Sequence, residues 1–506
     1  MYKRIMRYFS TFLFLCCTFI TLHAEYRYRL FLDGKPESTM TALSERALER
    51  RARQGIELDS TDLEVSPIYL QQLTDAGFKI VTRSRWLNSV VVMNADGKKV
   101  DDSIWQDFPF VLSRETVTTT QKANKVHKFL TDEEQKKANT DFDPSRRDNC
   151  KKPLIELNAM VPLYNAGYRG QGMLIAVLDG GFKNINHYDW LMSKVIGFRD
   201  MFAPEDSISL FKNETHGACC YSIMGSDLAH GVFGSAQDAD YYLVKTEAND
   251  CEVPLEEDMW VAGAELADSL GADLISSSLG YYDFDTPFNS HTHSQFATGE
   301  VFISRGARIA CQKGILVCNA AGNEADNQWK RIIFPADVEE VLTVGGTTPD
   351  LTPAYFTSRG FLTPYVKPDV SCRATNCYTV NANTTSGTAS DTGAGTSFAT
   401  PLMCGLAASL WSAVPSLKPA QIRQVIRESA NQFANPDSIL GYGMPDFGIA
   451  LAKAQELAGQ EASIDAIQTE PLRSDNSHYY NLQGQRVATQ QKNGIYIRDG
   501  RLIIVR

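Results

Sequence analysis

Between about residues 153 and 459, short apolar runs alternate with helical stretches, and this alternation constrains the fold more than any other feature of the chain. Stretches with a helical pattern, such as 260–270 and 304–313, lie between the runs. Strands that are apolar on both faces and separated by helices predict a parallel sheet with helices on both faces. We therefore expect a large α/β domain over residues 153–459. Its apolar runs are Leu174–Leu178, Tyr242–Val244, Leu274–Ser277, Ile315–Cys318 and Val341–Val344.

A smaller module is expected before this domain, at residues 25–114. Its strand and helix patterns predict a compact α+β unit, in which Ser44 caps the first helix and Gly77 ends the second. Residues 115–152 are polar and rich in Lys and Thr, so we expect a linker there that proteases can cleave. The expected strands are 26–32, 78–81, 89–93 and 110–113, and the expected helices are 44–54, 68–76 and 101–108.

The first 24 residues have the pattern of a signal peptide. Three basic residues, the last of them Arg7, precede an uncharged stretch over 8–22 that is too short to span a bilayer comfortably. Ala24 supplies a small residue for cleavage before Glu25. We therefore expect an exported protein, secreted, periplasmic or at the cell surface, with no transmembrane segment after cleavage.

Short strand patterns return in residues 460–506. The Asp499-Gly500 pair, between the runs 494–498 and 501–505, is typical of a two-residue hairpin. This part of the chain is therefore expected to form a small β module.

Charge and cysteine content exclude some functions. Lys and Arg number 49 against 60 Asp and Glu, so the formal net charge of −11 predicts no general surface for nucleic acid. Two of the 11 cysteines, Cys16 and Cys17, lie in the leader. The remainder is an odd number, so at least one thiol is unpaired unless it bridges to another chain. No Cys-x-x-Cys pair occurs, which argues against a structural zinc site.

Polar residues that directly follow strands of a parallel sheet lie at the edge where such sheets bind ligands. Asp179 ends the run 174–178 and precedes two glycines that let the chain turn, although a turn-forming Asp would look the same. His216 opens a helical stretch that ends at Met224. An acidic partner would keep its ring oriented and basic, and the alternative is a histidine that only packs.

Ser397 and Asn323 are the other candidates. Ser397 should lie at the start of the small-residue helix expected over 402–411, because Pro401 is tolerated only near a helix start. Unpaired backbone N–H groups should then lie beside its hydroxyl. Asn323 follows the run 315–318 and carries an amide donor that suits oxyanion stabilisation. A helix-capping serine and a turn asparagine are the alternatives.

The strings V-L-D-G-G-F, T-H-G, A-A-G-N-E and G-T-S-F-A-T-P occur in this order and resemble the motifs of the subtilisin-like serine proteases, the subtilases. The resemblance covers about residues 154–451, and 253–265 looks like Bacteroidetes-type secreted members. It implies a triad of Asp179, His216 and Ser397, with Asn323 as oxyanion donor. It also implies that Ser277, Ser278, Leu279 and Gly280 line the first substrate pocket.

The same resemblance implies a secreted serine endopeptidase that is made as a precursor and acts on protein or peptide substrates. Residues 25–114 would be a propeptide that aids folding and inhibits the protease. Residues 460–506 would be a short sorting tail that contacts export machinery. The chemistry requires no cofactor. Structural calcium is not located, because no loop shows an ordered ligand spacing. An inactive binding or surface protein on the same scaffold and an esterase are the alternatives.

The sequence departs from the family's pattern beside two of these residues. Gly180 stands where the family usually has Thr or Ser, and C-C-Y-S follows H-G-A where it usually has H-V-A-G, so side-chain hydrogen bonds of those positions are missing. Cys220, four residues after His216, should lie one helical turn from the ring. It resembles the cysteine of the thiol-containing, proteinase K-like branch. A small buried residue without a role and one half of a disulfide are the alternatives.

Overall fold

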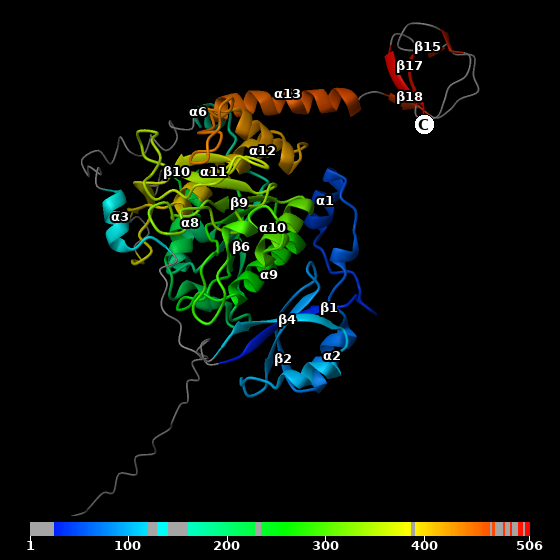
Figure 1. The fold of residues 1–506 in the computed structure, drawn as a ribbon. Coiled ribbons are helices and arrows are strands. Elements are labelled where there is room, and N and C mark those ends of the chain that lie inside the picture. Colours follow the sequence, from blue (N-terminus) through cyan, green and yellow to red (C-terminus); the bar gives the residue numbers. More distant parts are fainter. Residues whose placement is uncertain are drawn as a thin grey trace, which may run out of the picture.

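The structure is a computed structural model that describes residues 25–119, 129–139, 160–227, 234–385 and 390–465, together with the strands of the C-terminal module. Within these residues, an N-terminal module lies against one side of a larger α/β domain (Figure 1). The predicted signal peptide, residues 1–24, lies outside the described residues.

The α/β domain is built around a seven-stranded sheet in the order β11-β10-β9-β8-β5-β7-β6. All neighbouring strands run parallel, as the apolar runs predicted. The strands are β5 (Leu174–Asp179), β6 (Val195–Asp200), β7 (Asp240–Lys245), β8 (Leu274–Ser277), β9 (Leu316–Ala320), β10 (Leu342–Thr347) and β11 (Val370–Arg373).

Helices cover both faces of this sheet, because its strands are apolar on both sides. In β5, Ile175 and Val177 pack into the core that includes α8 and α11, whereas Leu174 and Leu178 pack into the core that includes α9 and α10. The predicted α/β architecture is therefore confirmed. The helices are α6 (Val161–Asn165), α7 (Asp189–Met192), α8 (His216–Gly225), α9 (Leu255–Leu270), α10 (Phe302–Gln312), α11 (Thr396–Ala413), α12 (Pro419–Glu428) and α13 (Phe447–Asp465).

The N-terminal module is a four-stranded antiparallel sheet in the order β2-β3-β1-β4, with α2 packed on β2. The predicted cap of its first helix is confirmed, since the Ser44 side chain accepts a hydrogen bond from the backbone N–H of Ala47 at 3.1 Å. Its elements are β1 (Arg27–Leu32), α1 (Glu45–Gln54), α2 (Pro67–Asp75), β2 (Phe78–Ser84), β3 (Ser89–Asn94) and β4 (Val111–Thr118). A short 3-10 helix, Asp102–Asp107, stands where a helix was expected over 101–108.

Three elements cross the boundaries drawn from the sequence. β4 continues past residue 114 to Thr118. Most of its side chains are exposed, and backbone pairing to β1 holds this edge strand in place. Helix α3 (Asp132–Ala138) lies inside the expected linker 115–152. Helix α13 continues past residue 459 to Asp465.

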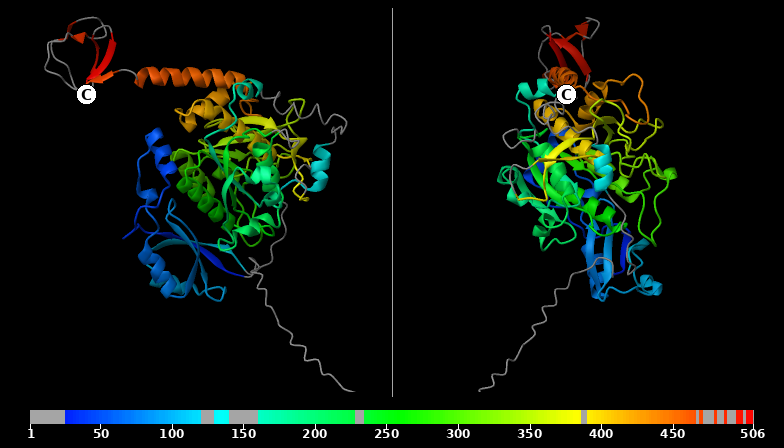
Figure 2. Two further views of the ribbon diagram at one scale, coloured as in Figure 1. Left: turned by 180° about the vertical axis from the view of Figure 1, so that it is seen from behind. Right: turned by 90° about the vertical axis from the view of Figure 1, so that its left-hand side faces the viewer.

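The C-terminal module contains short strands in the order β14-β18-β17-β15-β16 and lies beyond the end of α13, apart from the parallel sheet (Figures 1 and 2). β17 and β18 pair antiparallel with Arg498 opposite Arg501, which fits the predicted hairpin. Within the described residues, no helix combines the length and the apolar character needed to span a bilayer. The strands are β14 (Gln468–Glu470), β15 (Tyr479–Tyr480), β16 (Arg486–Val487), β17 (Gly494–Arg498) and β18 (Arg501–Val505).

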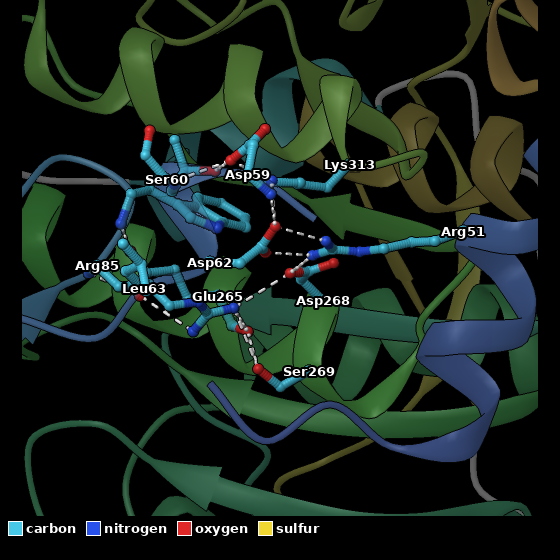
Figure 3. A network of polar contacts seen from close by, with 12 residues as sticks. Arg51, Asp59, Ser60, Asp62, Leu63, Arg85, Glu265, Asp268, Ser269 and Lys313 are labelled. Carbon is cyan, nitrogen blue, oxygen red and sulfur yellow. Dashed lines mark hydrogen bonds and ion pairs between the residues drawn. The ribbon is translucent and has the colours of Figure 1, made fainter. Parts of the chain in front are cut away.

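Buried ion pairs hold the N-terminal module against α9 (Figure 3). The fully buried carboxylate of Asp268, on α9, accepts hydrogen bonds from two arginines of α1. These are Arg50, at 2.5 Å, and Arg51, at 2.6 Å. Arg85, the residue after β2, adds a third at 3.1 Å and also contacts Glu265 at 3.2 Å. A single acid on α9 therefore joins three cations of the module.

Asp62 extends this network to the end of α10. Its carboxylate accepts hydrogen bonds from Arg51 and Lys313, each at 2.9 Å. Burial favours a higher pKa of Asp62, but the hydrogen bonds from these two cations lower it to about 2. Charges can be buried only when each has a partner of opposite sign, so the loss of one partner is costly.

We expect Asp268→Ala to lower the free energy of unfolding of the full-length chain by about 3–5 kcal/mol, because three arginines would lose their common buried carboxylate. Urea titration measures this quantity. The control is Asp206→Ala, which removes an ion pair to Lys212 whose side chains are 61% and 57% exposed. That change should cost less than about 1 kcal/mol. Equal effects of the two substitutions would contradict a structural role for the network.

Candidate active site

Asp179 is the last residue of β5 and lies at the carboxyl edge of the sheet. It is fully buried, and its Oδ1 accepts a hydrogen bond from the backbone N–H of Gly180 at 2.7 Å. The same oxygen lies 2.8 Å from Nδ1 of His216. The other carboxylate oxygen, Oδ2, is buried and receives no N–H or O–H hydrogen bond within the described part of the chain. This agrees with the missing hydroxyl side chain at position 180.

His216 is the first residue of α8 and is buried. Gly217 allows α8 to lie close to β5, since a Cβ there would be 2.8 Å from Cβ of Asp179. The backbone N–H of His216 donates to Glu214 Oε1 at 3.1 Å, which fixes the start of the helix. Because a carboxylate only accepts, the hydrogen bond to Asp179 assigns the proton to Nδ1 and leaves Nε2 as the acceptor of the ring.

Ser397 is the second residue of α11, which begins at Thr396 and not at residue 402 as predicted. Pro401 lies inside this helix. Proline has no N–H, so the carbonyl four residues earlier, that of Ser397, loses its helical partner. The structure provides two other donors for this oxygen: the Ser278 hydroxyl at 2.7 Å and the Cys220 thiol at 3.3 Å. The helix therefore continues through the proline.

Asn323 follows β9 and lies in the same cleft as Ser397. Its Oδ1 accepts hydrogen bonds from the backbone N–H of Thr396 at 2.8 Å and from the Thr396 hydroxyl at 3.0 Å. These two donors assign the orientation of the amide. The Nδ2 group of Asn323 is thereby placed as the donor on the side away from Thr396.

The segment 277–280, predicted to line a substrate pocket, divides into two parts. Ser278, Leu279 and Gly280 line the cleft that also contains Asn323 and Ser397. Ser277 does not line it. Its hydroxyl accepts a hydrogen bond from the indole N–H of Trp260, on α9, at 2.9 Å, so this side chain belongs to the core.

Phe129, which the sequence analysis did not single out, covers the ring of His216. The two rings stack with centroids 3.6 Å apart and planes at 13°. Phe129 lines the cleft beside Ser397 and also a neighbouring cavity of about 720 Å³ that contains His216. A side chain from the expected linker therefore occupies the centre of the candidate site.

Helix α3 anchors this segment on the α/β domain. The hydroxyl of Tyr355 donates to the carbonyl of Glu134 at 3.4 Å, and the Lys137 ammonium lies 4.3 Å from the centre of the Tyr355 ring. The backbone N–H of Asn376 donates to Oδ1 of Asn139 at 2.7 Å. A sequence signal for this helix exists: Thr131 and Glu134 form a capping box, whose T-x-x-E pattern marks a helix start.

Two groups of metal-capable side chains occur within the described residues. One is Asp179, His216 and Cys220. The other is Glu247, Glu252 and Glu256, all buried, where backbone N–H groups of residues 248 and 253 already donate to both oxygens of Glu256. Calcium takes six to eight oxygen ligands, so three carboxylates with such partners do not define a calcium site.

Known proteins resemble this chain in sequence. The model of the subtilase family matches residues 170–443, and the model of the peptidase S8 propeptide domain of Bacteroidota matches residues 27–137. The thermostable alkaline protease of Halalkalibacterium halodurans is 28% identical over 337 residues, 64% of this chain and 82% of that protein. Subtilisin DY of Bacillus licheniformis is 26% identical over 270 residues, 53% and 87% of the two chains. A solved structure of the prenylagaramide maturation protease PagA aligns with a TM-score of 0.47 at 20% identity, covering 58% of this chain and 98% of that one.

Because the first family match spans more than half of the sequence, the chain belongs to the subtilase family. It is a subtilisin-like serine protease, and the propeptide match means that it is made as a precursor. The propeptide match ends at residue 137, so it includes Phe129 and nearly all of α3.

Cys220 lies beneath the ring of His216, as its spacing predicted. Its Sγ is 3.7 Å from Nδ1 of His216, and its side chain is fully buried and forms no disulfide. The structure therefore contradicts the disulfide alternative. Burial, with the charge of Asp179, raises the pKa of the Cys220 thiol well above its ordinary value, so the thiol is neutral.

An excess of an aryl mercurial should inactivate the wild-type protein slowly, because a bulky group on Cys220 must displace His216. Cys220→Ala should remain active and become resistant. The measurement is the rate of inactivation of peptide hydrolysis for the two proteins. Full wild-type activity after complete modification of Cys220, or equal inactivation of the variant, would show that this cysteine is not coupled to the site.

Proposed function

We propose that the protein is an exported endopeptidase that cleaves peptide bonds through Asp179, His216 and Ser397, with Asn323 stabilising the oxyanion. The observation that carries this proposal is the buried 2.8 Å hydrogen bond from His216 to Asp179 at the sheet edge. The thiol of Cys220 contacts both the His216 ring and the Ser397 carbonyl, so these two residues lie close together.

In the proposed mechanism, Nε2 of His216 accepts the proton of the Ser397 hydroxyl as Oγ attacks the peptide carbonyl. Asp179 holds the ring in the required tautomer and stabilises the imidazolium that forms. The oxyanion receives hydrogen bonds from Nδ2 of Asn323 and from the backbone N–H of Ser397 at the start of α11. His216 then protonates the leaving amine, and water hydrolyses the acyl-enzyme. These steps use only side chains, one backbone N–H group and water, so the proposed chemistry requires no cofactor.

Export is part of the proposal and rests on the leader pattern of residues 1–24 and on the secreted character implied by the subtilase resemblance. We propose protein or peptide substrates. We also propose that the C-terminal module contacts the export machinery.

A fluorophosphonate probe should label the mature wild-type protein and fail to label Ser397→Ala, because the probe reacts with an activated serine hydroxyl. Gel fluorescence and peptide mapping measure the label. The control is Ser409→Ala, which removes a buried hydroxyl of the same helix that bonds the carbonyl of Ser235 and lies outside the cleft. Label that survives Ser397→Ala, or its absence from the wild type, would overturn the assignment. The second result would favour the inactive binding protein.

We further propose that the N-terminal module and the 129–138 segment aid folding and keep the precursor inactive, with Phe129 shielding His216. Removing one stacked aromatic ring is worth about 0.5–1.5 kcal/mol, so Phe129→Ala should speed self-processing about two- to tenfold. A mass-spectrometric time course measures this rate, and the new N-terminus should lie within 115–149. Lys136→Ala, an exposed change on α3, is the control. Unchanged or slower processing of Phe129→Ala would contradict the shielding role.

A further inference from the structure

The first turn of α8, which carries His216, is capped in an unusual way. Among the described residues, Thr215 directly precedes this helix, and its side chain makes no capping hydrogen bond. The first backbone N–H groups of a helix have no partner within the helix, so another acceptor must supply one. Here Oε1 of Glu214 accepts from the backbone N–H of Thr215 at 2.7 Å and from that of His216 at 3.1 Å. Glu214 therefore holds the backbone from which the His216 ring projects, and its negative charge suits a helix N-terminus.

The backbone of Glu214 is itself attached to the chain that leaves β5. Its carbonyl accepts a hydrogen bond from the backbone N–H of Lys183 at 2.8 Å. In the same way, the carbonyl of Leu210 accepts from the backbone N–H of Phe182 at 2.7 Å. Segment 210–214 is therefore held beside the residues that directly follow Asp179. Through its backbone and its side chain, Glu214 joins the end of β5 to the start of α8.

Glu214 can occupy this place because residues 180 and 181 have no side chains. A Cβ on Gly180 would lie 3.3 Å from Cγ of Glu214, and one on Gly181 would lie 2.9 Å from its Cβ. Both separations are shorter than an ordinary van der Waals contact, so a side chain at either position would have to displace Glu214. The glycine that removes the hydroxyl expected beside Asp179 therefore makes room for Glu214.

These observations describe two arrangements that exclude one another. A serine or threonine at position 180 would place a hydroxyl next to Asp179, whose Oδ2 receives no N–H or O–H hydrogen bond within the described residues. This chain instead fixes the start of α8. We propose that Glu214 is a positioning residue that keeps His216 aligned with Asp179 and takes the place of the side chain that the family usually carries at position 180. This inference rests on the proposed function, since it concerns the histidine of the proposed triad.

A direct contact with substrate is the alternative role for Glu214, because it lines the cavity of about 720 Å³ that contains His216. The two roles differ in the kinetic constant that they affect. Loss of a contact that binds substrate and transition state equally raises KM, whereas displacement of the general base slows the reaction of bound substrate and lowers kcat. A displacement of about 1 Å at a catalytic group can lower the rate about a hundredfold.

The first test expresses each variant as the full-length chain, lets it mature, and measures kcat and KM for a peptide per site labelled by fluorophosphonate. Glu214→Ala removes the acceptor and should lower kcat about tenfold or more, with KM within about twofold of the wild-type value. Glu214→Gln keeps an acceptor oxygen at the same reach and should retain kcat within about threefold. The control is Asp446→Ala, which removes an oxygen that accepts from the backbone N–H groups of residues 448 and 449 at the start of α13. Asp446 lines neither cavity, so this change should affect neither constant.

Gly180→Ser tests the mutual exclusion directly. In the wild-type background it should lower kcat about three- to tenfold, because its Cβ displaces Glu214. In the Glu214→Ala background the same change should raise kcat, because the space is open and the new hydroxyl can donate to Asp179. A residue that only stabilises the fold would not produce this reversal of sign. If Glu214→Ala does not mature, Gly180→Ser and Glu214→Gln as single variants still carry the test.

Three results would overturn the inference: a rise of KM without a fall of kcat in Glu214→Ala, equal losses of kcat in the alanine and glutamine variants, or an effect of Gly180→Ser with the same sign in both backgrounds. If Glu214→Ala does not mature, unchanged or raised kcat in Gly180→Ser would overturn it. Labelling separates the two proposals. A labelled wild type together with unchanged kcat in Glu214→Ala contradicts only the positioning role, whereas an unlabelled wild type contradicts the proposed function as well.

Discussion

The carboxyl edge of the parallel sheet is the constraint on which the rest of the site depends. Parallel strands all end at the same edge, so residues far apart in the sequence meet there without any special contact between them. β5, β8 and β9 are neighbours in the sheet, and they bring Asp179, the segment 278–280 and Asn323 to one place. The starts of α8 and α11 add His216 and Ser397 from the same side. Position at this edge therefore assembles the site, and hydrogen bonds such as Asp179–His216 then set its geometry.

The contact between the N-terminal module and α9 follows a different principle. It depends on buried charge, because arginines of the module surround acids of α9, above all Asp268. Such a network adds little net stability over an apolar contact. Any other placement of the module would be costly, however, because it would leave a buried charge without its partner. The network therefore defines how the module sits on the domain. The module packs on α9 through these charges, whereas Phe129 stacks on the ring of His216.

The sheet and the meeting of Asp179 with His216 at its edge could be predicted from the sequence because their signals are local. A run such as Leu174–Leu178, which is apolar on both faces, is typical of a buried parallel strand. Segment 129–138 was missed because composition averaged over a polar window hid the capping box of Thr131 and Glu134. The start of α11 was misplaced because Pro401 is tolerated only through donors from Ser278 and Cys220, which are distant in sequence. Ion pairs such as Arg50 to Asp268 span 218 positions, and no local pattern predicts them.

The most direct test of the central claim, that a triad at the sheet edge performs covalent catalysis, is to trap the acyl-enzyme. The mature protein is mixed with an activated ester, quenched in acid after a fraction of one turnover, and digested for mass spectrometry. We expect at most one acyl group per protein, on the peptide that contains Ser397, and none on that peptide after His216→Ala. Ester or peptide hydrolysis with the acyl group on another residue, or equal acylation of Ser397 in His216→Ala, would contradict it.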